Sequence, residues 1–265
     1  YREHFDWEVK RNWLVKTPGI VFALAMAVRA FTEPGDAVLI QQPVYYPFSE
    51  VISDNGRKIV SSDLYAGEDN RYHIDFEDFE QKIRDERVKL FFLCNPHNPV
   101  ARVWTREELT RMGEICQKYQ VKVVSDEIHA DFVFKGKHQV FAAISKEFAD
   151  FTITCTSPSK TFNLAGLVGS YHIIYNTWLR ERVLKESSLS HYNAMNVLSM
   201  HALIGAYRPE GHEWLDELKA VLTGNVDYAY DYITKHFQGV SLAKPEGTYM
   251  LLLDCEQWCK AHGLT

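Results

Sequence analysis

Short apolar runs alternate with helical patterns between residues 19 and 175. The runs have the length of strands, and the stretches between them repeat apolar residues at three- and four-residue spacing, as helices do. Strands that alternate with helices form a largely parallel sheet covered on both faces. The sequence therefore predicts an α/β fold. The expected strands are AVLIQQ (37–42), KIVSSDL (58–64), VKLFFLC (88–94), VKVVSDE (121–127), FTITCTS (151–157) and LVGSYHIIY (167–175).

The pattern changes after residue 176, where longer helices are predicted over 177–189, 196–207 and 213–237. We expect these helices to lead toward a second domain. The last stretch, 239–265, is predicted to begin a strand and a turn.

Composition narrows the function classes. With 265 residues, 46% of them hydrophobic, the chain can bury a substantial core. The net charge is -6 and the Lys and Arg residues are dispersed, which argues against nucleic acid as a partner. The five cysteines show no zinc spacing and no CxxC pair, so we expect no metal site and a reducing cytoplasm. No apolar run is long enough to span a membrane, and the first residues are too polar for a signal peptide.

Polar motifs follow three of the expected strands. They are CNPHNP (94–99), SDEIHAD (125–131) and SPSK (157–160). A doubly wound sheet binds its ligand at the carboxyl ends of its strands, so these motifs are the first candidates for a site.

Lys160 and Asp126 are the residues in these motifs best suited to chemistry. Lys160 stands alone among serines and threonines in TSPSKTFNLAGL, either as a plain loop residue or as a reactive amine. Asp126 ends an apolar strand, where an acid costs desolvation unless it has a partner. A protonated ring nitrogen of a ligand would be such a partner.

Other candidates have ordinary structural alternatives. The helix predicted after Gly19 would offer the amides of Ile20 and Val21 to a phosphate, although every helix has such an end. Tyr45 could stack on a flat ligand or simply fill space. In the CNPHNP motif, Asn98 could direct its side-chain amide at a ligand oxygen, or the prolines could simply stiffen the loop.

His129 is the last candidate, and its alternative interpretation is a buried structural histidine.

After the CNPHNP motif, Thr105 and Glu108 form a capping-box pattern that predicts a helix start. A lysine, a buried acid, an asparagine, a stacking ring and a phosphate-ready helix end together match what pyridoxal phosphate requires.

The chain resembles the fold-type I, class I/II aminotransferases, and most of all their cystathionine β-lyase (carbon-sulfur lyase) branch. The resemblance covers nearly the whole chain and keeps the family's order of motifs. Those motifs are TPGIVFALAMAVRAFTEPGD, QQPVYYPF, NPHNPVARVWTREEL, SDEIHADFVF, SPSKTFNLAGL and KPEGTYMLLLDC.

The resemblance implies a fold, a cofactor and residue roles. The fold would be the transferase-like one of pyridoxal 5'-phosphate enzymes, with a cofactor-binding domain over 1–205 and, over 206–265, an interdomain helix and the start of a smaller α+β domain. The family's Asn-Pro motif commonly has a cis peptide, so Asn98-Pro99 is expected to be cis. The implied roles are a Schiff base for Lys160, pairing with the pyridine nitrogen for Asp126, the ring 3-oxygen for Asn98 and His129, ring stacking for Tyr45, and phosphate binding for the amides of Ile20 and Val21 and the Ser157 hydroxyl.

The chain departs from the wider family in several places. Val168 stands where many aminotransferases have a phosphate-binding arginine, which the lyase branch also lacks. Ala101 stands where glycine is usual, which would strain the turn if it needs a positive φ. The family's N-terminal segment and the arginine that holds the substrate carboxylate would lie outside the sequence, so we expect a fragment.

The implied activity is carbon-sulfur β-elimination, which cleaves cystathionine or a related cysteine S-conjugate to a thiol, pyruvate and ammonia. A class I/II aminotransferase is the alternative, because both reactions share their first steps. A regulatory or binding protein that keeps the fold is a second alternative. The family is normally homodimeric, so a homodimer is expected.

Overall fold

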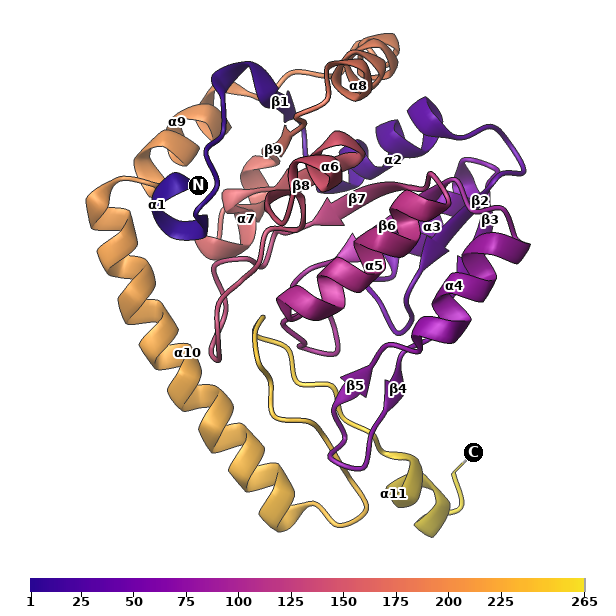
Figure 1. Ribbon diagram of the computed structural model, residues 1–265. Coiled ribbons are helices and arrows are strands. Elements are labelled where there is room, and N and C mark those ends of the chain that lie inside the picture. The colour runs from indigo at the N-terminus through magenta and orange to yellow at the C-terminus, as the bar shows by residue number, and fades with distance from the viewer. Residues whose placement is uncertain (265) are drawn as a thin grey trace.

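The computed structural model describes residues 1–264 and contains the predicted alternation of strands and helices (Figure 1). Within these residues a seven-stranded sheet has the order β1-β9-β8-β7-β6-β2-β3. Neighbours from β3 to β8 are parallel, whereas β9 runs antiparallel to β8 and to β1. The predicted α/β class with a mostly parallel sheet is therefore confirmed. The sheet strands are β1 (Leu14–Thr17), β2 (Ala37–Ile40), β3 (Lys58–Ser61), β6 (Leu90–Cys94), β7 (Lys122–Asp126), β8 (Thr152–Thr156) and β9 (Ser170–Ile173).

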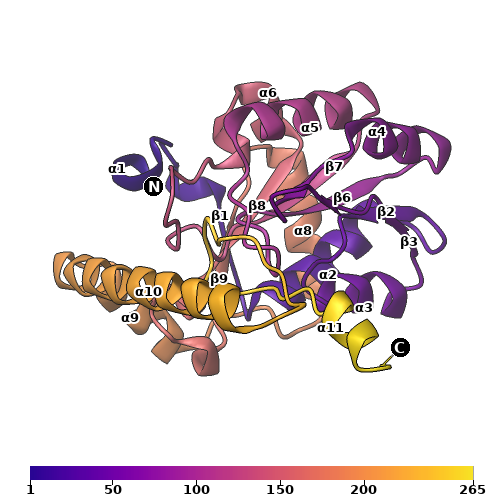
Figure 2. The ribbon, with the colours of Figure 1, turned by 90° about the horizontal axis from the view of Figure 1, so that it is seen from below.

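Helices cover both faces of the sheet (Figure 2). One face packs against α2, α3 and α8, and the other against α4, α5 and α6. These helices are α2 (Ile20–Phe31), α3 (Pro47–Asp54), α4 (Phe76–Asp85), α5 (Arg106–Lys118), α6 (Lys146–Asp150) and α8 (Thr177–Leu189). The others are α1 (Arg2–Phe5), α7 (Pro158–Thr161), α9 (Val197–Ala206), α10 (Pro209–His236) and α11 (Glu256–Ala261).

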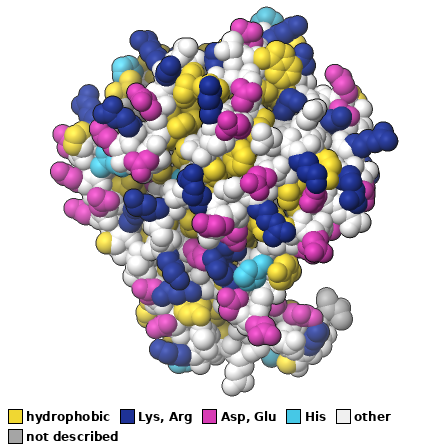
Figure 3. Space-filling model, viewed as in Figure 1, with side chains coloured by type: hydrophobic (Ala, Val, Ile, Leu, Met, Phe, Trp, Pro, Cys, Tyr) yellow, Lys and Arg dark blue, Asp and Glu magenta, His cyan; other side chains and the backbone are white. Residues whose placement is uncertain are grey.

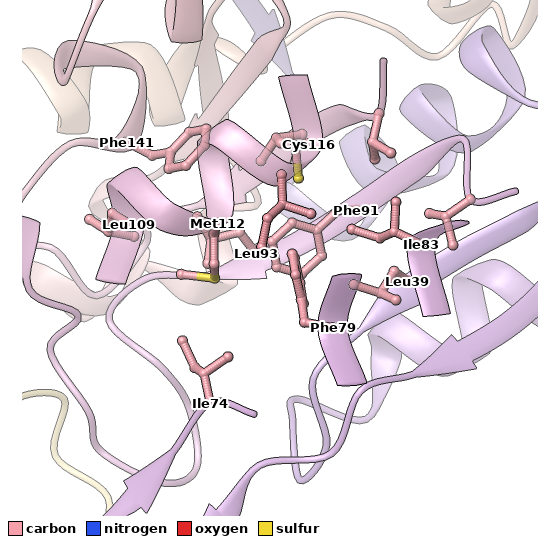
Figure 4. Close-up of a cluster of buried hydrophobic side chains, with 14 of the residues drawn as sticks. Leu39, Ile74, Phe79, Ile83, Phe91, Leu93, Leu109, Met112, Cys116 and Phe141 are labelled. Carbon is pink, nitrogen blue, oxygen red and sulfur yellow. The ribbon is translucent and has the colours of Figure 1, made fainter. Parts of the chain in front are cut away.

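The central strand β6 shows how the two cores are divided. Successive side chains of a strand point to opposite faces. Leu90 and Phe92 accordingly join the core under α2 and α3, while Phe91 and Leu93 join the core under α4 and α5 (Figure 4). Because both faces are covered, the strand is apolar throughout instead of alternating with polar residues.

The capping box at the start of α5 is confirmed. The Glu108 amide donates to Thr105 Oγ1 at 3.1 Å, and the Thr105 amide donates to the Glu108 carboxylate at 2.8 Å. This reciprocal pair satisfies two amides that the helix itself leaves without acceptors. It fixes where the chain turns after the CNPHNP motif.

The three helices predicted after residue 176 are confirmed as α8, α9 and the long α10. The strand expected in 239–265 is wrong, since the described part of this stretch has only isolated bridges and α11. Its backbone is divided among different loops: the Glu246 amide bonds to Ala101, and the Thr248 amide bonds to Phe132. Within residues 239–264, pairing is therefore limited to isolated bridges. The short β1 and the hairpin of β4 (Tyr65–Ala66) and β5 (Tyr72–His73) were not predicted.

Basic and acidic side chains are interspersed over the face shown in Figure 3. Among residues 1–264, no helix combines the length and apolar character that crossing a bilayer requires. The division into domains at residues 205 and 206 stays a prediction.

Candidate active site

The candidate site lies where three parallel strands end. Cys94 at the end of β6 is paired with Asp126 at the end of β7, and Asp126 is paired with Cys155 in β8. This register brings the three polar motifs that follow these strands to one edge of the sheet. The edge is where a doubly wound sheet places its ligand.

One cavity at this edge is lined by every residue that the sequence analysis proposed for the site. They are Ile20, Val21, Tyr45, Asn98, Asp126, His129, Ser157 and Lys160. The structure thus brings together residues that are spread over more than half of the sequence, while their individual roles stay predictions. The remaining lining residues are Gly19, Cys94, Ile128, Ser159, Ala165, Val168 and Gly169. Of these, Ser159 could have been found as part of SPSK, whereas Gly169 has no comparable signal.

Asp126 is buried at the cavity, with 5% of its surface exposed. Burial is the main reason that the pKa of Asp126 is raised to about 7, and the Glu127 charge raises the pKa further. The Ile128 amide, which donates to the Asp126 carboxylate at 3.2 Å, and the Lys160 charge both lower this pKa. The carboxylate is therefore costly to ionise in the absence of a cationic partner. A positively charged group entering from the cavity would relieve that cost.

His129 is also buried beside the cavity, and its ring packs edge-on against Tyr249 with centroids 5.4 Å apart. Burial, followed by the Lys160 charge, lowers the pKa of His129 to about 4. The ring is neutral near pH 7, and within the described chain its Nδ1 has no hydrogen-bond partner. Buried polar atoms are nearly always paired, so this atom is suited to a ligand.

Tyr45 and Asn98 are held together by the backbone. The Tyr45 amide donates to the Asn98 carbonyl at 3.0 Å, and the Asn98 amide points to Cys94 Sγ at 3.3 Å. Burial raises the pKa of Tyr45, so its phenol keeps its proton. The predicted cis bond at Asn98-Pro99 is confirmed, and Gln42-Pro43 and Asn95-Pro96 are cis as well.

Ser157 begins the short helix α7 that carries Lys160. Its hydroxyl accepts from the Ser159 amide at 3.1 Å, lies 2.6 Å from Ser159 Oγ and donates to the Gly169 carbonyl at 2.6 Å. The Ser157 hydroxyl therefore shapes the loop as well as lining the cavity. Next to Lys160, Thr161 donates to Asp131 at 2.7 Å and anchors the helix.

The amino end of α2 reaches the same cavity. Gly19 has φ 110° and ψ 158°, a conformation that essentially only glycine adopts. No described side chain caps this helix, so the amides of Ile20 and Val21 are open to an anion. Two residues that depart from the wider family also have positive φ: Val168 at 48°, on the cavity wall, and Ala101 at 58°. The turn at Ala101 thus has the strained conformation that glycine usually relieves.

Comparisons with known proteins show the family to which the chain belongs. The family model "Aminotransferase class I and II" matches residues 4–262. The chain belongs to the class I and II aminotransferase family. It is 43% identical to the cystathionine beta-lyase PatB of Bacillus subtilis over 94% of this chain and 64% of that protein.

Two solved structures show the same fold. Cystalysin from Treponema denticola, whose structure contains pyridoxal 5'-phosphate, has a TM-score of 0.93 at 36% identity over 99% of this chain and 66% of that one. The C-S lyase from Staphylococcus hominis, also bound to the cofactor, has a TM-score of 0.92 at 34% identity over 100% of this chain and 66% of that one. The chain thus spans slightly less than two thirds of the length of these relatives.

A metal centre has no support in the described part of the chain. Residues 1–264 contain no group of three or more His, Cys, Asp or Glu side chains arranged to hold a metal ion. The lysine, the buried acid and the uncapped helix end are the groups that this cavity offers to a ligand.

Proposed function

We propose that the protein is a pyridoxal 5'-phosphate-dependent carbon-sulfur β-lyase that cleaves cystathionine or a related cysteine S-conjugate. The observation that carries the proposal is the cavity that Lys160, the buried Asp126 and His129 line together. The Nδ1 atom of this histidine has no partner within the described chain. The names of the relatives, cystathionine beta-lyase and C-S lyase, favour this chemistry over others of the family.

The donor set suits the cofactor. When bound, pyridoxal 5'-phosphate supplies an electron sink for the carbanion formed at the substrate's α-carbon. Asp126 is an acid whose raised pKa calls for a cation, and His129 has a free ring nitrogen. The proposed contacts are Lys160 with the cofactor aldehyde, Asp126 with the ring nitrogen, His129 and Asn98 with the 3-oxygen, Tyr45 with the ring face, and Ile20, Val21 and Ser157 with the phosphate.

The reaction asks two things of this chain. The amine of Lys160 would take the proton from the α-carbon of the substrate as a general base. Asp126 would hold a proton at the ring nitrogen of the bound cofactor. The bond between the β-carbon and sulfur then breaks with its electron pair leaving on the thiolate, and water converts the remaining three-carbon fragment to pyruvate and ammonia.

Amino transfer is the alternative, and it uses the same Lys160 and Asp126. In an aminotransferase, Lys160 would return the proton to the cofactor carbon, and a keto acid would be released. Val168, in place of the arginine that many aminotransferases use, supports the lyase. We further propose that the protein works as a homodimer in the cytoplasm.

The test uses the full-length protein with pyridoxal 5'-phosphate and cystathionine, without a keto-acid acceptor. We expect pyruvate and a free thiol in equal amounts, and a loss of about a thousandfold or more in the Lys160→Ala variant. Amino transfer without pyruvate, seen once a keto acid is added, would identify an aminotransferase. Retention of the cofactor without either reaction would indicate a binding role.

A further inference from the structure

A buried chain of polar side chains crosses β8, β9 and β1 beside the cavity. Thr17 Oγ1 lies 2.6 Å from Ser170 Oγ and 2.8 Å from His172 Nε2. At its far end, His172 Nδ1 lies 3.0 Å from Cys155 Sγ. None of the four side chains is more than 1% exposed.

This chain of hydrogen bonds ends at the backbone of the candidate site. The Gly19 amide donates to Ser170 Oγ at 3.1 Å. The hydrogen bonds of this chain can all run from Cys155 toward Ser170 or all run in the reverse direction. In both arrangements Ser170 Oγ accepts from the Gly19 amide. Burial lowers the pKa of His172 to about 4 and raises that of the Cys155 thiol, so the whole chain is uncharged near pH 7.

The Gly19 amide is the last one before α2 begins. Its peptide plane sets the direction in which the chain enters the helix, and the next two residues, Ile20 and Val21, line the cavity. Ser170, whose hydroxyl accepts from the Gly19 amide and does not line the cavity, fixes this plane. Without the hydroxyl, the amide would have to turn toward another acceptor, because an unpaired buried amide is costly.

The segment that carries Ser170 is itself held firmly. Ser157 donates to the Gly169 carbonyl at 2.6 Å, and Ser199 donates to the Leu167 carbonyl. Ser170 and Thr17 are also directly paired in the β1–β9 ladder. The acceptor for Gly19 is therefore rigid, as the support of a binding group should be.

We propose that Ser170, supported by Thr17 and His172, is a positioning residue that aims the first amides of α2 at the phosphate of the cofactor. The inference rests on the proposed function, because it takes that phosphate as the ligand. It assigns Ser170 no contact with the cofactor. Its effect should depend on the phosphate and not on the ring.

The test compares two ligands in the full-length protein, pyridoxal 5'-phosphate and pyridoxal, which lacks the phosphate. Binding is followed by the absorbance of the bound cofactor. Ser170→Ala is expected to weaken pyridoxal 5'-phosphate about five- to tenfold and pyridoxal less than about twofold. Thr17→Val keeps its shape and should weaken the phosphate form by about threefold.

Thr154→Val is the matched control. Thr154 lies in β8, is fully buried, and its hydroxyl has no partner in the described chain. This variant should bind both ligands as the wild type does. Equal losses for both ligands in Ser170→Ala and Thr17→Val, or no loss in either variant, would overturn the positioning role. A wild type that bound neither ligand would instead overturn the proposed function.

Discussion

Asp126 and Glu127 are adjacent acids, both buried, and their surroundings differ completely. Glu127 accepts from Ser125 at 2.8 Å and from the Phe141 amide at 3.1 Å, and it lies 2.8 Å from His138 Nε2. Asp126 has the Ile128 amide at 3.2 Å and otherwise faces the cavity. The Glu127 cluster is closed within the protein, whereas the Asp126 region leaves a carboxylate for a ligand.

The difference shows that the partners of a buried acid indicate whether its role is structural or functional. A buried charge that has its hydrogen bonds is part of the structure, and its removal should cost stability. A buried acid such as Asp126, in a cavity that a lysine also lines, is costly to ionise and is a candidate for binding or catalysis.

The largest effect is expected from removing the Glu127 carboxylate, whose hydrogen-bond partners all lie within the protein. Glu127→Ala should lower the free energy of unfolding by about 3–5 kcal/mol, because it leaves His138 and the Phe141 amide buried without their acceptor. Urea denaturation measures this loss. Glu127→Gln, which keeps the size and one acceptor, should lose less. A Glu127→Ala variant that kept its stability and failed only in cofactor binding would instead assign Glu127 to ligand binding, as proposed for Asp126.

Asp126→Asn should have the opposite profile. We expect kcat/KM for pyruvate formation to fall about a hundredfold, because a neutral amide cannot stabilise a protonated ring nitrogen. The free energy of unfolding of the cofactor-free protein should stay within about 1 kcal/mol of the wild type or rise, because a costly buried acid is removed. A large loss of stability with unchanged kcat/KM would abolish the distinction between the two acids.

The pH dependence gives the smallest expected effect. The folded pKa of Asp126, about 7, lies above the unfolded value, which is about 3.9. Between these values the folded protein keeps a proton that the unfolded chain loses, so this group lowers the free energy of unfolding as the pH rises. His97, His129 and His172, each with a pKa lowered to about 4 by burial, act in the opposite direction up to about pH 6.5.

The contribution of Asp126 is therefore measured as a difference. Denaturation of the cofactor-free wild type and of Asp126→Asn at several pH values should give a wild-type-minus-variant stability that falls by about 3 kcal/mol between pH 4 and 7 and becomes flat above about pH 8. A difference that stayed nearly flat over this range and changed only below about pH 4 would mean that the pKa of Asp126 is lowered, as expected for an acid with its partners inside the protein.

Much of the fold could be predicted because its signals are local. Composition and spacing predict the apolar runs that form β2, β3, β6, β7, β8 and β9. They also predict the capping box at Thr105. The error in the last stretch has a tertiary cause, since the amides of Glu246 and Thr248 bond to two separate loops. Strand β1, only four residues long, is defined by its pairing with β9 rather than by its own pattern.

The candidate site was likewise predictable only in part from the sequence. The sequence by itself determined that polar motifs follow buried strands, and the order of those motifs carried the family resemblance. Only the tertiary structure decided that Asp126 faces the cavity while Glu127 faces Ser125 and His138, and that Ser170 meets Thr17 across 153 positions of the chain. Periodicity and turn chemistry act over a few residues and are therefore visible in one segment. Hydrogen-bond partners and burial arise from contacts between distant segments, which no single segment encodes.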